Sequence, residues 1–213
     1  MAASPDTYSV RGIDVSHYQG EVNWADVARD GIQFAFIKAT DGASIVDPNF
    51  RTNWANARSA GILCGAYHFL RPNTDGKEQG EHFASLVGPS RGSLPPALDI
   101  EVTEGVEPQA VEQAIIDWIG AVKKTTDVRP VLYTSPAFWT DHVGADFQSY
   151  PLWLACYDKE PKMPAHWPQW TFWQHSQSGR VAGVSGQVDL NVFRSTFADL
   201  KALCIGSNGA PLV

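Results

Sequence analysis

The sequence lacks the features of several classes of protein. No run approaches eighteen apolar residues, so a membrane-spanning helix is excluded and no membrane insertion is expected. No cluster of Lys and Arg stands out, and the formal net charge of −7 disfavours a nucleic-acid-binding surface. The first ten residues, MAASPDTYSV, lack the basic and apolar regions of a secretory signal. Export by another route and a trimmed mature form would both give this start.

Cysteines and histidines are not spaced as in disulfide frameworks or metal sites. The three cysteines, Cys64, Cys156 and Cys204, lie far apart, are odd in number and form no C-x-x-C pair. Buried free thiols are therefore expected. The six histidines form no H-x-x-x-H motif, the local spacing that zinc enzymes use. We expect neither a metal nor another cofactor.

The chain is instead rich in core-forming and aromatic side chains. Of its 213 residues, 44% are hydrophobic and 18% are charged, which is typical of a globular domain with a substantial core. The length fits one domain of α/β-barrel size. Eight Trp, ten Phe and six Tyr suit either a bulky core or a site that stacks against flat ligand faces. The numbers alone do not decide between the two.

Strand and helix patterns alternate through the first two thirds of the chain. Apolar strands are predicted over 10–16, 34–40, 62–70, 94–102 and 129–135, and helices follow them near 23–31, 48–60, 77–88, 107–126 and 136–143. Strands over 151–157, 171–177 and 187–193 are separated by loops, and a helix over 195–203 follows. The pattern predicts an α/β fold, an irregular TIM-like (β/α) barrel with eight strands, the last three with few intervening helices. We expect one barrel domain over 10–204, with tails at 1–9 and 205–213.

The stretch LPPALDIEV, residues 94–102, carries an informative pair of acids. Because side chains alternate along a strand, one face holds Leu98, Ile100 and Val102 and the other holds Ala97, Asp99 and Glu101. Alternate positions are roughly 6.6 Å apart, so both carboxylates can reach one small volume, and their repulsion raises at least one pKa. Asp99 and Glu101 are therefore candidates for general acid/base chemistry. The alternative is an ordinary strand end whose acids are solvated or salt-bridged.

Polar residues also interrupt the other predicted strands near their ends. They are Asp14, Lys38, Tyr67, His68, Tyr133, Trp153, Tyr157, Gln174 and Asp189. In a barrel the carboxyl ends of parallel strands meet at one mouth, where active sites lie. One shared cleft explains the pattern better than many independently buried polar groups. Local alternatives stay open, because Asp14 and Asp189 could cap turns and Lys38 could form a structural ion pair instead of binding substrate.

A cleft of this composition suits glycoside hydrolysis. One acid can protonate the leaving oxygen while anionic groups stabilise an oxocarbenium-like centre, and Trp and Tyr faces offer sugar rings an apolar platform. Glu101, nearer the strand end, is the candidate proton donor. Asp99, one pleat further in, would orient or stabilise the reacting groups.

Eight motifs follow one another along the chain: RGIDVSHYQG, FAFIKATDG, GAYHFLRP, ALDIE, VLYTS, LWLACY, TFWQHS and VDLNVF. Together, from about residue 10 to 203, they resemble glycoside hydrolase family 25, the N-acetylmuramidase lysozymes that cut peptidoglycan between N-acetylmuramic acid and N-acetylglucosamine. The resemblance implies an irregular eight-stranded α/β barrel. It makes Glu101 the acid/base and Asp99 its partner, with Asp14 and Asp189 as further acids of the floor. It also implies that the sugar chain is held by Tyr67, Tyr133, Trp153, Tyr157 and Gln174.

The nucleophile stays open at this point. By analogy with other enzymes that bear paired acids on a strand, Asp99 would position the substrate's own 2-acetamido group as an internal nucleophile. A direct nucleophile, or a water activated across the cleft by Asp14 or Asp189, is the alternative. Asp41 departs from the family, which often has Glu there, and this affects a peripheral contact. No cell-wall-binding repeats follow residue 205, so we expect a catalytic domain alone.

Two rival functions fit parts of the pattern. A metal-dependent polysaccharide deacetylase would use His17, His68 or His175 with Asp14 and Asp99 as ligands. A non-catalytic glycan-binding module would use the acids for recognition only. The first predicts sensitivity to chelators, and the second predicts no activity for Glu101→Gln to remove.

The expected partners are peptidoglycan glycan strands, and a monomer is expected. Action on the bacterial cell wall follows from the resemblance, on its extracellular or periplasmic side. A chain without a visible signal peptide suits phage-lysin-like release or export by a dedicated machine. The sequence leaves the biological setting, the stereochemical outcome and the preferred peptidoglycan modification open.

Overall fold

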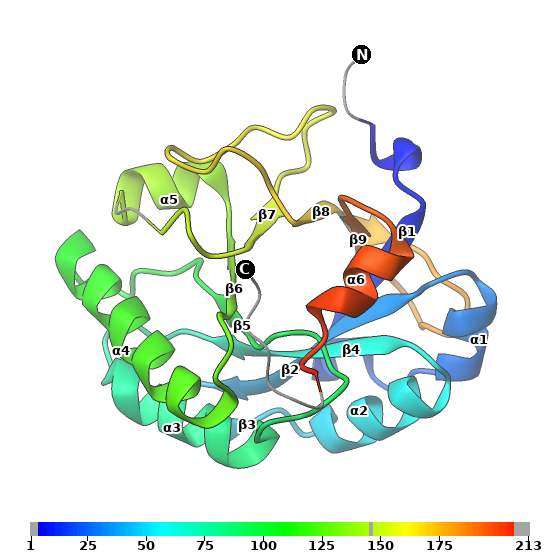
Figure 1. Ribbon diagram of the computed structural model, residues 1–213, viewed down its shortest axis with the longest axis horizontal. Helices are drawn as coiled ribbons and strands as arrows, with labels where there is room; N and C mark the ends of the chain where they lie inside the picture. Colours follow the sequence, from blue (N-terminus) through cyan, green and yellow to red (C-terminus); the bar gives the residue numbers. More distant parts are fainter. Residues whose placement is uncertain (1–3, 145–146, 207–213) are drawn as a thin grey trace.

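A single sheet of nine strands forms the centre of the computed structural model, which describes residues 4–144 and 147–206 (Figure 1). The strands are β1 (Val10–Val15), β2 (Phe34–Asp41), β3 (Ile45–Val46), β4 (Leu63–Phe69), β5 (Ala97–Asp99), β6 (Val131–Thr134), β7 (Leu152–Ala155), β8 (Phe172–Gly179) and β9 (Val188–Phe193). The helices are α1 (Trp24–Arg29), α2 (Phe50–Ser59), α3 (Gly76–Val87), α4 (Pro108–Thr126), α5 (Pro136–His142) and α6 (Phe197–Leu203), with short 3₁₀ helices η1 (Pro5–Thr7) and η2 (His17–Gln19).

Eight of the strands close into a barrel, as predicted. Their order is β1-β9-β8-β7-β6-β5-β4-β2, and β1 pairs with β2 to close the ring, while β3 pairs only with the edge of β2. All neighbours are parallel except β9, which runs antiparallel to both β8 and β1. Within 147–206, no helix separates β7, β8 and β9, which confirms the irregular last third. The reversed direction of β9 was not predicted.

Residues that typically begin or end a helix lie at the observed ends of the helices. The side chain of Asn23 caps α1 by accepting a hydrogen bond from the Asp26 backbone N–H, and Pro108 opens α4. Gly88 ends α3 with a φ of 60°, a conformation that glycine adopts without strain. One face of α4 is apolar and buried: Val111, Ile115, Trp118, Ile119 and Val122. The helices α1 to α5 surround the strands (Figure 1).

The predicted strand over 94–102 is shorter in the structure. Pro95 and Pro96 have no N–H to give to a ladder, so β5 begins only at Ala97. The predicted faces are confirmed, because Ala97 belongs to the hydrophobic cluster inside the barrel, whereas Leu98 and Ile100 belong to the cluster between strands and helices. The strand ends at Asp99. Glu101 therefore lies just beyond the strand rather than within it.

Aromatic rings fill the inside of the barrel. Phe36 on β2 stacks on Trp153 of β7, with ring centroids 4.3 Å apart, although these strands are not neighbours in the sheet. Two glycines make room for rings inside the barrel. A Cβ at Gly12 would lie 2.3 Å from the ring of Phe34, and a Cβ at Gly65 would lie 2.5 Å from the ring of Phe36. Each ring buried in this way contributes roughly 1.5–3 kcal/mol. The barrel is thus a packed core and not a channel.

One end of the barrel is closed by α6. Leu200 on this helix is fully buried in the inner cluster, together with Val10, Phe34 and Phe193. These residues lie at the end where the parallel strands begin and β9 finishes. The inside of the barrel is therefore closed at this end. A ligand can approach the inward-facing side chains from the opposite end, where the parallel strands finish.

The expected tails fall partly outside the described residues, namely at 1–3 and 207–213. Tyr8 packs edge-on against Trp170 at 4.9 Å, and Ile205 is buried and hydrogen-bonded through its backbone to Ser93. The domain limits stay a prediction. Among the described residues, all three cysteines are free thiols, and none of the helices is both long and apolar enough to cross a bilayer.

Candidate active site

The polar groups at the open end of the barrel are placed there by the alternation of side chains along its strands. Six of the parallel strands carry a polar residue two positions after an apolar or small inward-facing one: Gly12 then Asp14, Phe36 then Lys38, Gly65 then Tyr67, Ala97 then Asp99, Val131 then Tyr133, and Phe172 then Gln174. On β9 the order is reversed, from Phe193 to Asn191 to Asp189, because the strand is antiparallel. Asp189 thus reaches the mouth from the amino end of its strand. All the polar groups meet at one rim.

Asp99 and Glu101 form the first acid pair of the site. Asp99 is 7% exposed, and its Oδ1 atom is buried without a hydrogen-bond partner among the described residues. Glu101 is an exposed residue beyond the end of β5. Both carboxylates line the same two adjoining pockets, of about 200 and 190 Å³. Glu101 therefore faces an open groove and is not sealed inside the protein.

Both pKa values of this pair are raised. Burial raises the pKa of Asp99 well above its usual range, and the neighbouring Glu101 charge raises it further. The pKa of Glu101 is raised by partial desolvation from the surrounding groups and by Asp189, and it is held down by the Lys38 ammonium. Because both pKa values are raised, the two carboxyls keep their protons to a higher pH than isolated carboxyls do.

Asp14 and Asp189 form the second acid pair. They lie directly opposite one another on the antiparallel strands β1 and β9. Asp14 is 6% exposed and accepts hydrogen bonds from Gln174 Nε2 at 3.0 Å and Asn191 Nδ2 at 2.7 Å. Burial and the charge of Asp189 raise the pKa of Asp14. The pKa of Asp189 is also raised, by its partial burial, and the neighbouring Asp14 opposes that rise.

A hydrogen-bond network connects this pair to the aromatic side of the cleft. Tyr133 Oη and Tyr157 Oη both donate to Gln174 Oε1, at 2.9 and 2.7 Å. Trp153 Nε1 donates to Asn191 Oδ1 at 2.7 Å. Each amide is thereby fixed with its NH₂ group toward Asp14. Trp153 is 1% exposed, so its ring belongs to the floor of the cleft and offers little surface to a ligand.

Lys38 takes part in an ion-pair cluster on the other side of the cleft. Its Nζ lies 2.8 Å from Asp41 Oδ2, and the guanidinium of Arg71 contacts the same carboxylate at 2.7 Å. Both cations lie near the ring of Phe69, at 4.6 and 4.5 Å from its centroid. The structural ion pair expected as one alternative for Lys38 is thus present. Lys38 also lines the smaller of the two pockets, so the substrate-binding alternative stays a prediction.

All ten predicted site residues line one or both pockets: Asp14, Lys38, Tyr67, Asp99, Glu101, Tyr133, Trp153, Tyr157, Gln174 and Asp189. The structure adds Val15, Ser16, Tyr18, Gln19, Phe69 and Gln177 to the lining and Asn191 to the network. Asn191 could have been found, because it lies two residues from Asp189 on the same strand face. Tyr18 gave no such signal, since it lies in a turn. Ser16 caps that turn, so turn capping does not account for Asp14.

The histidines of the deacetylase alternative do not converge. His68 is fully buried, and its ring nitrogens contact Thr40 Oγ1 at 2.7 Å and Gln79 Oε1 at 3.0 Å. Burial lowers its pKa to about 4. His17 contacts Asp47 instead of a cleft acid. Over residues 4–144 and 147–206, no three His, Cys, Asp or Glu side chains are grouped to hold a metal ion.

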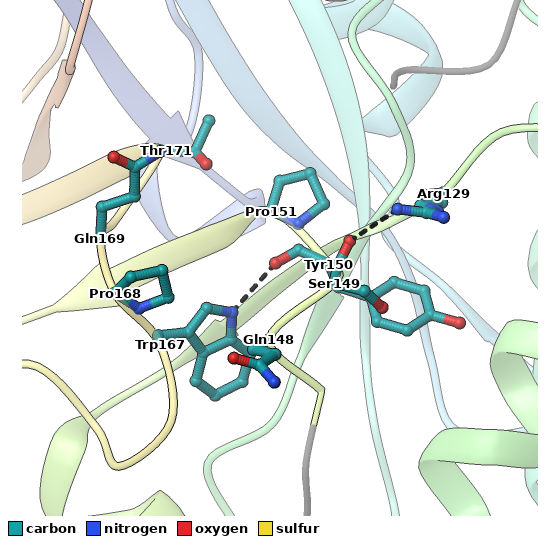
Figure 2. Close-up of a pocket in the computed structure, with 9 residues that line it drawn as sticks. All are labelled: Arg129, Gln148, Ser149, Tyr150, Pro151, Trp167, Pro168, Gln169 and Thr171. Atoms are coloured by element: carbon teal, nitrogen blue, oxygen red, sulfur yellow. Dashed lines mark hydrogen bonds between the residues drawn. The ribbon is translucent and has the colours of Figure 1, made fainter.

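A further pocket, of about 240 Å³, lies where β6, β7 and β8 begin. Figure 2 shows its lining, in which Arg129 donates to the Ser149 carbonyl at 3.1 Å and Trp167 Nε1 to the Tyr150 carbonyl at 3.0 Å. No Asp or Glu is among its nine lining residues. It therefore offers no group that could act as an acid at neutral pH. This pocket therefore differs from the cleft at the other end of the strands, which four acids line.

Comparison with known proteins agrees with this geometry. The chain matches glycosyl hydrolases family 25 over residues 13–184. Lysozyme M1 of Streptomyces globisporus is 41% identical over 212 residues, covering 93% of this chain and 72% of that protein. An N,O-diacetylmuramidase of Chalaropsis sp is 33% identical over 217 residues, covering 93% of this chain and 100% of the other. The crystal structure of the bacterial lysozyme from Streptomyces coelicolor has a TM-score of 0.89 at 41% identity, covering 96% and 100% of the two chains. With sequence and fold matching over nearly its whole length, the chain belongs to glycosyl hydrolase family 25.

Proposed function

We propose that this protein is a muramidase that hydrolyses the β-1,4 bond between N-acetylmuramic acid and N-acetylglucosamine in peptidoglycan. The observation that carries the proposal is the placement of Glu101 in an open cleft, beside the deeper carboxyl of Asp99, with the pKa values of both raised. The membership of family 25, with lysozyme and muramidase relatives, supports the same activity. Peptidoglycan is the substrate class, and the cell wall is the place of action.

Glu101 is the proton donor in this proposal. Glycoside cleavage needs a carboxylic acid that is still protonated near neutral pH and within reach of the leaving oxygen. The raised pKa of Glu101 favours the first condition, and its position in the lining of both pockets supports the second. After the leaving sugar departs, the Glu101 carboxylate can take a proton from the incoming water. The same group then serves as acid and as base.

Asp99 positions the reacting sugar from below. Its unpartnered Oδ1 atom costs free energy as long as no donor reaches it, on the order of 1–3 kcal/mol for a buried polar atom. The N–H of a 2-acetamido group is a donor that both sugars of the substrate carry. A hydrogen bond from it to Asp99 would hold the acetamido oxygen toward the anomeric carbon as the internal nucleophile. Water activated by Asp14 or Asp189 is the alternative nucleophile, because both carboxylates line the cleft.

The remaining residues of the cleft bind the glycan strand. Tyr67 and Tyr157 offer ring surface to the sugar, and Gln177 and Lys38 offer hydrogen-bond donors at the rim. Tyr133, Trp153 and Gln174 act through the network that fixes Asp14. We propose action as a monomer on the outer side of the membrane, with export by a lysin-like or machine-delivered route.

Mass spectrometry of the products from purified peptidoglycan tests the bond that is cut. We expect fragments with N-acetylmuramic acid at the reducing end, because the proton from Glu101 is delivered to the oxygen that links it to N-acetylglucosamine. Reduction with borohydride before analysis marks that end. Fragments that end in reducing N-acetylglucosamine would contradict the proposal and assign the cut to the other linkage.

Chelation separates the muramidase from a metal-dependent deacetylase. We expect the lytic rate to stay within experimental error in excess EDTA, because the described cleft residues act as acids and not as a ligand set. The measurement is the fall in turbidity of a cell-wall suspension, with and without chelator. A loss of activity that added Zn²⁺ restores would favour the deacetylase and contradict the proposal.

A further inference from the structure

Exposed aromatic rings are rare on this protein. Of the Phe, Trp and Tyr side chains in the described residues, only Tyr18 and Tyr157 are exposed, with exposed fractions of 82% and 49%. Leaving a ring in water forgoes the stabilisation that its burial would give, so an isolated exposed ring in a chain that buries its other rings points to a ligand. Both rings lie at the acid cleft.

The two tyrosines lie in different lobes of this cleft. The pocket of about 200 Å³ includes Tyr157, and the pocket of about 190 Å³ includes Tyr18. The two pockets share five lining residues: Asp14, Tyr67, Asp99, Glu101 and Asp189. The four acids thus lie where the lobes meet, with one exposed ring in the lobe on either side.

The Tyr18 ring is held in place although it is exposed. It packs against the ring of His17, with ring centroids 4.1 Å apart and an angle of 37° between the ring planes. His17 is itself fixed by the buried carboxylate of Asp47, which its Nδ1 contacts at 2.7 Å and its backbone N–H at 2.9 Å. Ser16 and Gln19 cap the turn that carries both rings. A ring held in this way loses little conformational entropy when a ligand stacks on it.

We propose that Tyr18 is a sugar-stacking residue that binds the glycan strand on the side of the acids opposite Tyr157, so that the bond to be cut lies between the two rings. The inference rests on the proposed function, because it takes the glycan strand as the ligand of this cleft. Tyr18 then contacts only a sugar that extends past the acids into its own lobe. Its effect grows with the length of the substrate on that side.

The test compares Tyr18→Ala with Tyr18→Phe, and uses Ile45→Ala as a matched control. Ile45 is 58% exposed on β3 and lines neither pocket, so its removal takes away exposed apolar surface without touching the cleft. We expect Tyr18→Ala to lower kcat/KM on long glycan strands by about tenfold, mainly through KM, which is the loss of one stacking contact. Tyr18→Phe keeps the ring and stays within about twofold of the wild type.

A binding measurement makes the outcome independent of turnover. In a Glu101→Gln background, calorimetry with glycan oligomers of increasing length should give a Kd about tenfold weaker for Tyr18→Ala, and only with oligomers long enough to fill both lobes. Melting temperatures of all variants should match, because the Tyr18 ring is exposed.

The outcomes separate this inference from the proposed function. Equal values for Tyr18→Ala and Ile45→Ala, with a wild type that cleaves normally, would overturn the Tyr18 role alone. A loss in Tyr18→Phe as large as in Tyr18→Ala would assign the effect to the hydroxyl group and overturn stacking. A wild type that neither binds nor cleaves glycan strands would overturn the proposed function as well.

Discussion

Replacing Glu101 with Gln is expected to lower the rate of peptidoglycan hydrolysis by roughly 10²–10⁴-fold, which is the usual contribution of a positioned general acid. The amide has nearly the same shape as the carboxyl but has no acidic proton to give to the leaving oxygen. Because Glu101 is exposed beyond the end of β5, the substitution leaves the packing of the barrel unchanged. We expect kcat to fall while KM changes little. Product release measured by reducing-end assay gives both values.

Glu107→Gln is the matched control for this prediction. Glu107 is exposed, precedes α4 without capping it through its side chain, and lines neither lobe of the cleft. Glu107→Gln is the same chemical change as Glu101→Gln. The rate of the control variant therefore shows any effect of losing one negative charge. A Glu101→Gln enzyme with more than about a tenth of the wild-type rate would contradict the acid role. A wild-type protein that binds glycan strands but never cleaves them would identify a glycan-binding module.

Replacing Asp99 with Asn is expected to lower kcat by roughly 10²–10³-fold, the usual cost of losing one preorganised group that stabilises charge. The neutral amide can no longer accept a strong hydrogen bond at the buried Oδ1 position or balance the positive charge that develops on the reacting acetamido group. Rates on strands with and without 2-acetamido groups give the measurement. If Asp99 acts through that group, the loss should be large only on acetylated sugars.

The same substitution should make the protein more stable at pH 7. The folded pKa of Asp99 is raised above its ordinary value of 3.8. Below that value the carboxyl is protonated in the folded and unfolded chains alike, so there is no penalty. As pH rises, the unfolded chain loses the proton first, and the wild-type protein loses about 1.4 kcal/mol of stability for each unit of the shift until the folded pKa is passed. Asn does not titrate and escapes this penalty.

Thermal unfolding at two pH values checks the sign. We expect Asp99→Asn to melt higher than the wild type at pH 7, by about 2–4 °C for each kcal/mol, and the gain to disappear near pH 3. Asp141→Asn, an exposed site on α5, is the control and should show no such dependence. A gain of equal size at both pH values would mean that packing, and not the raised pKa, is responsible.

The cleft could be predicted in large part because strand periodicity carries the information. Residues two apart on a strand share a face, so Ala97 with Asp99 and Phe172 with Gln174 indicate which polar groups lie above the packed interior. The same rule applied to β9 would have included Asn191 beside Asp189. The alternation of strands and helices likewise predicted a closed barrel, since parallel strands need crossover connections.

Other features depended on contacts between distant parts of the chain. The direction of β9 is set by its pairing with both β1 and β8, and the short loops on either side of it are compatible with more than one arrangement. The ion-pair cluster connects Lys38 and Asp41 on β2 to Arg71, thirty residues beyond Asp41 in the loop after β4, beside the ring of Phe69. The exposure of the Tyr18 ring depends on whether any other segment of the folded chain packs over it. Such features produce no periodic pattern of residues in the sequence, so they could not be predicted from it.

By itself, the sequence determined the strand and helix pattern, the inward faces of the strands and the set of acids at their ends, because these follow from local periodicity and from side-chain chemistry. Only the tertiary structure decided which carboxyls have raised pKa values, since that depends on burial and on neighbours across the barrel: Asp189 and the amides around Asp14, and Glu101 beside Asp99. It also decided that the two exposed tyrosines lie in lobes that meet at these acids. The burial of a side chain, and the identity of the residues that face it inside the closed barrel, are set only by three-dimensional packing.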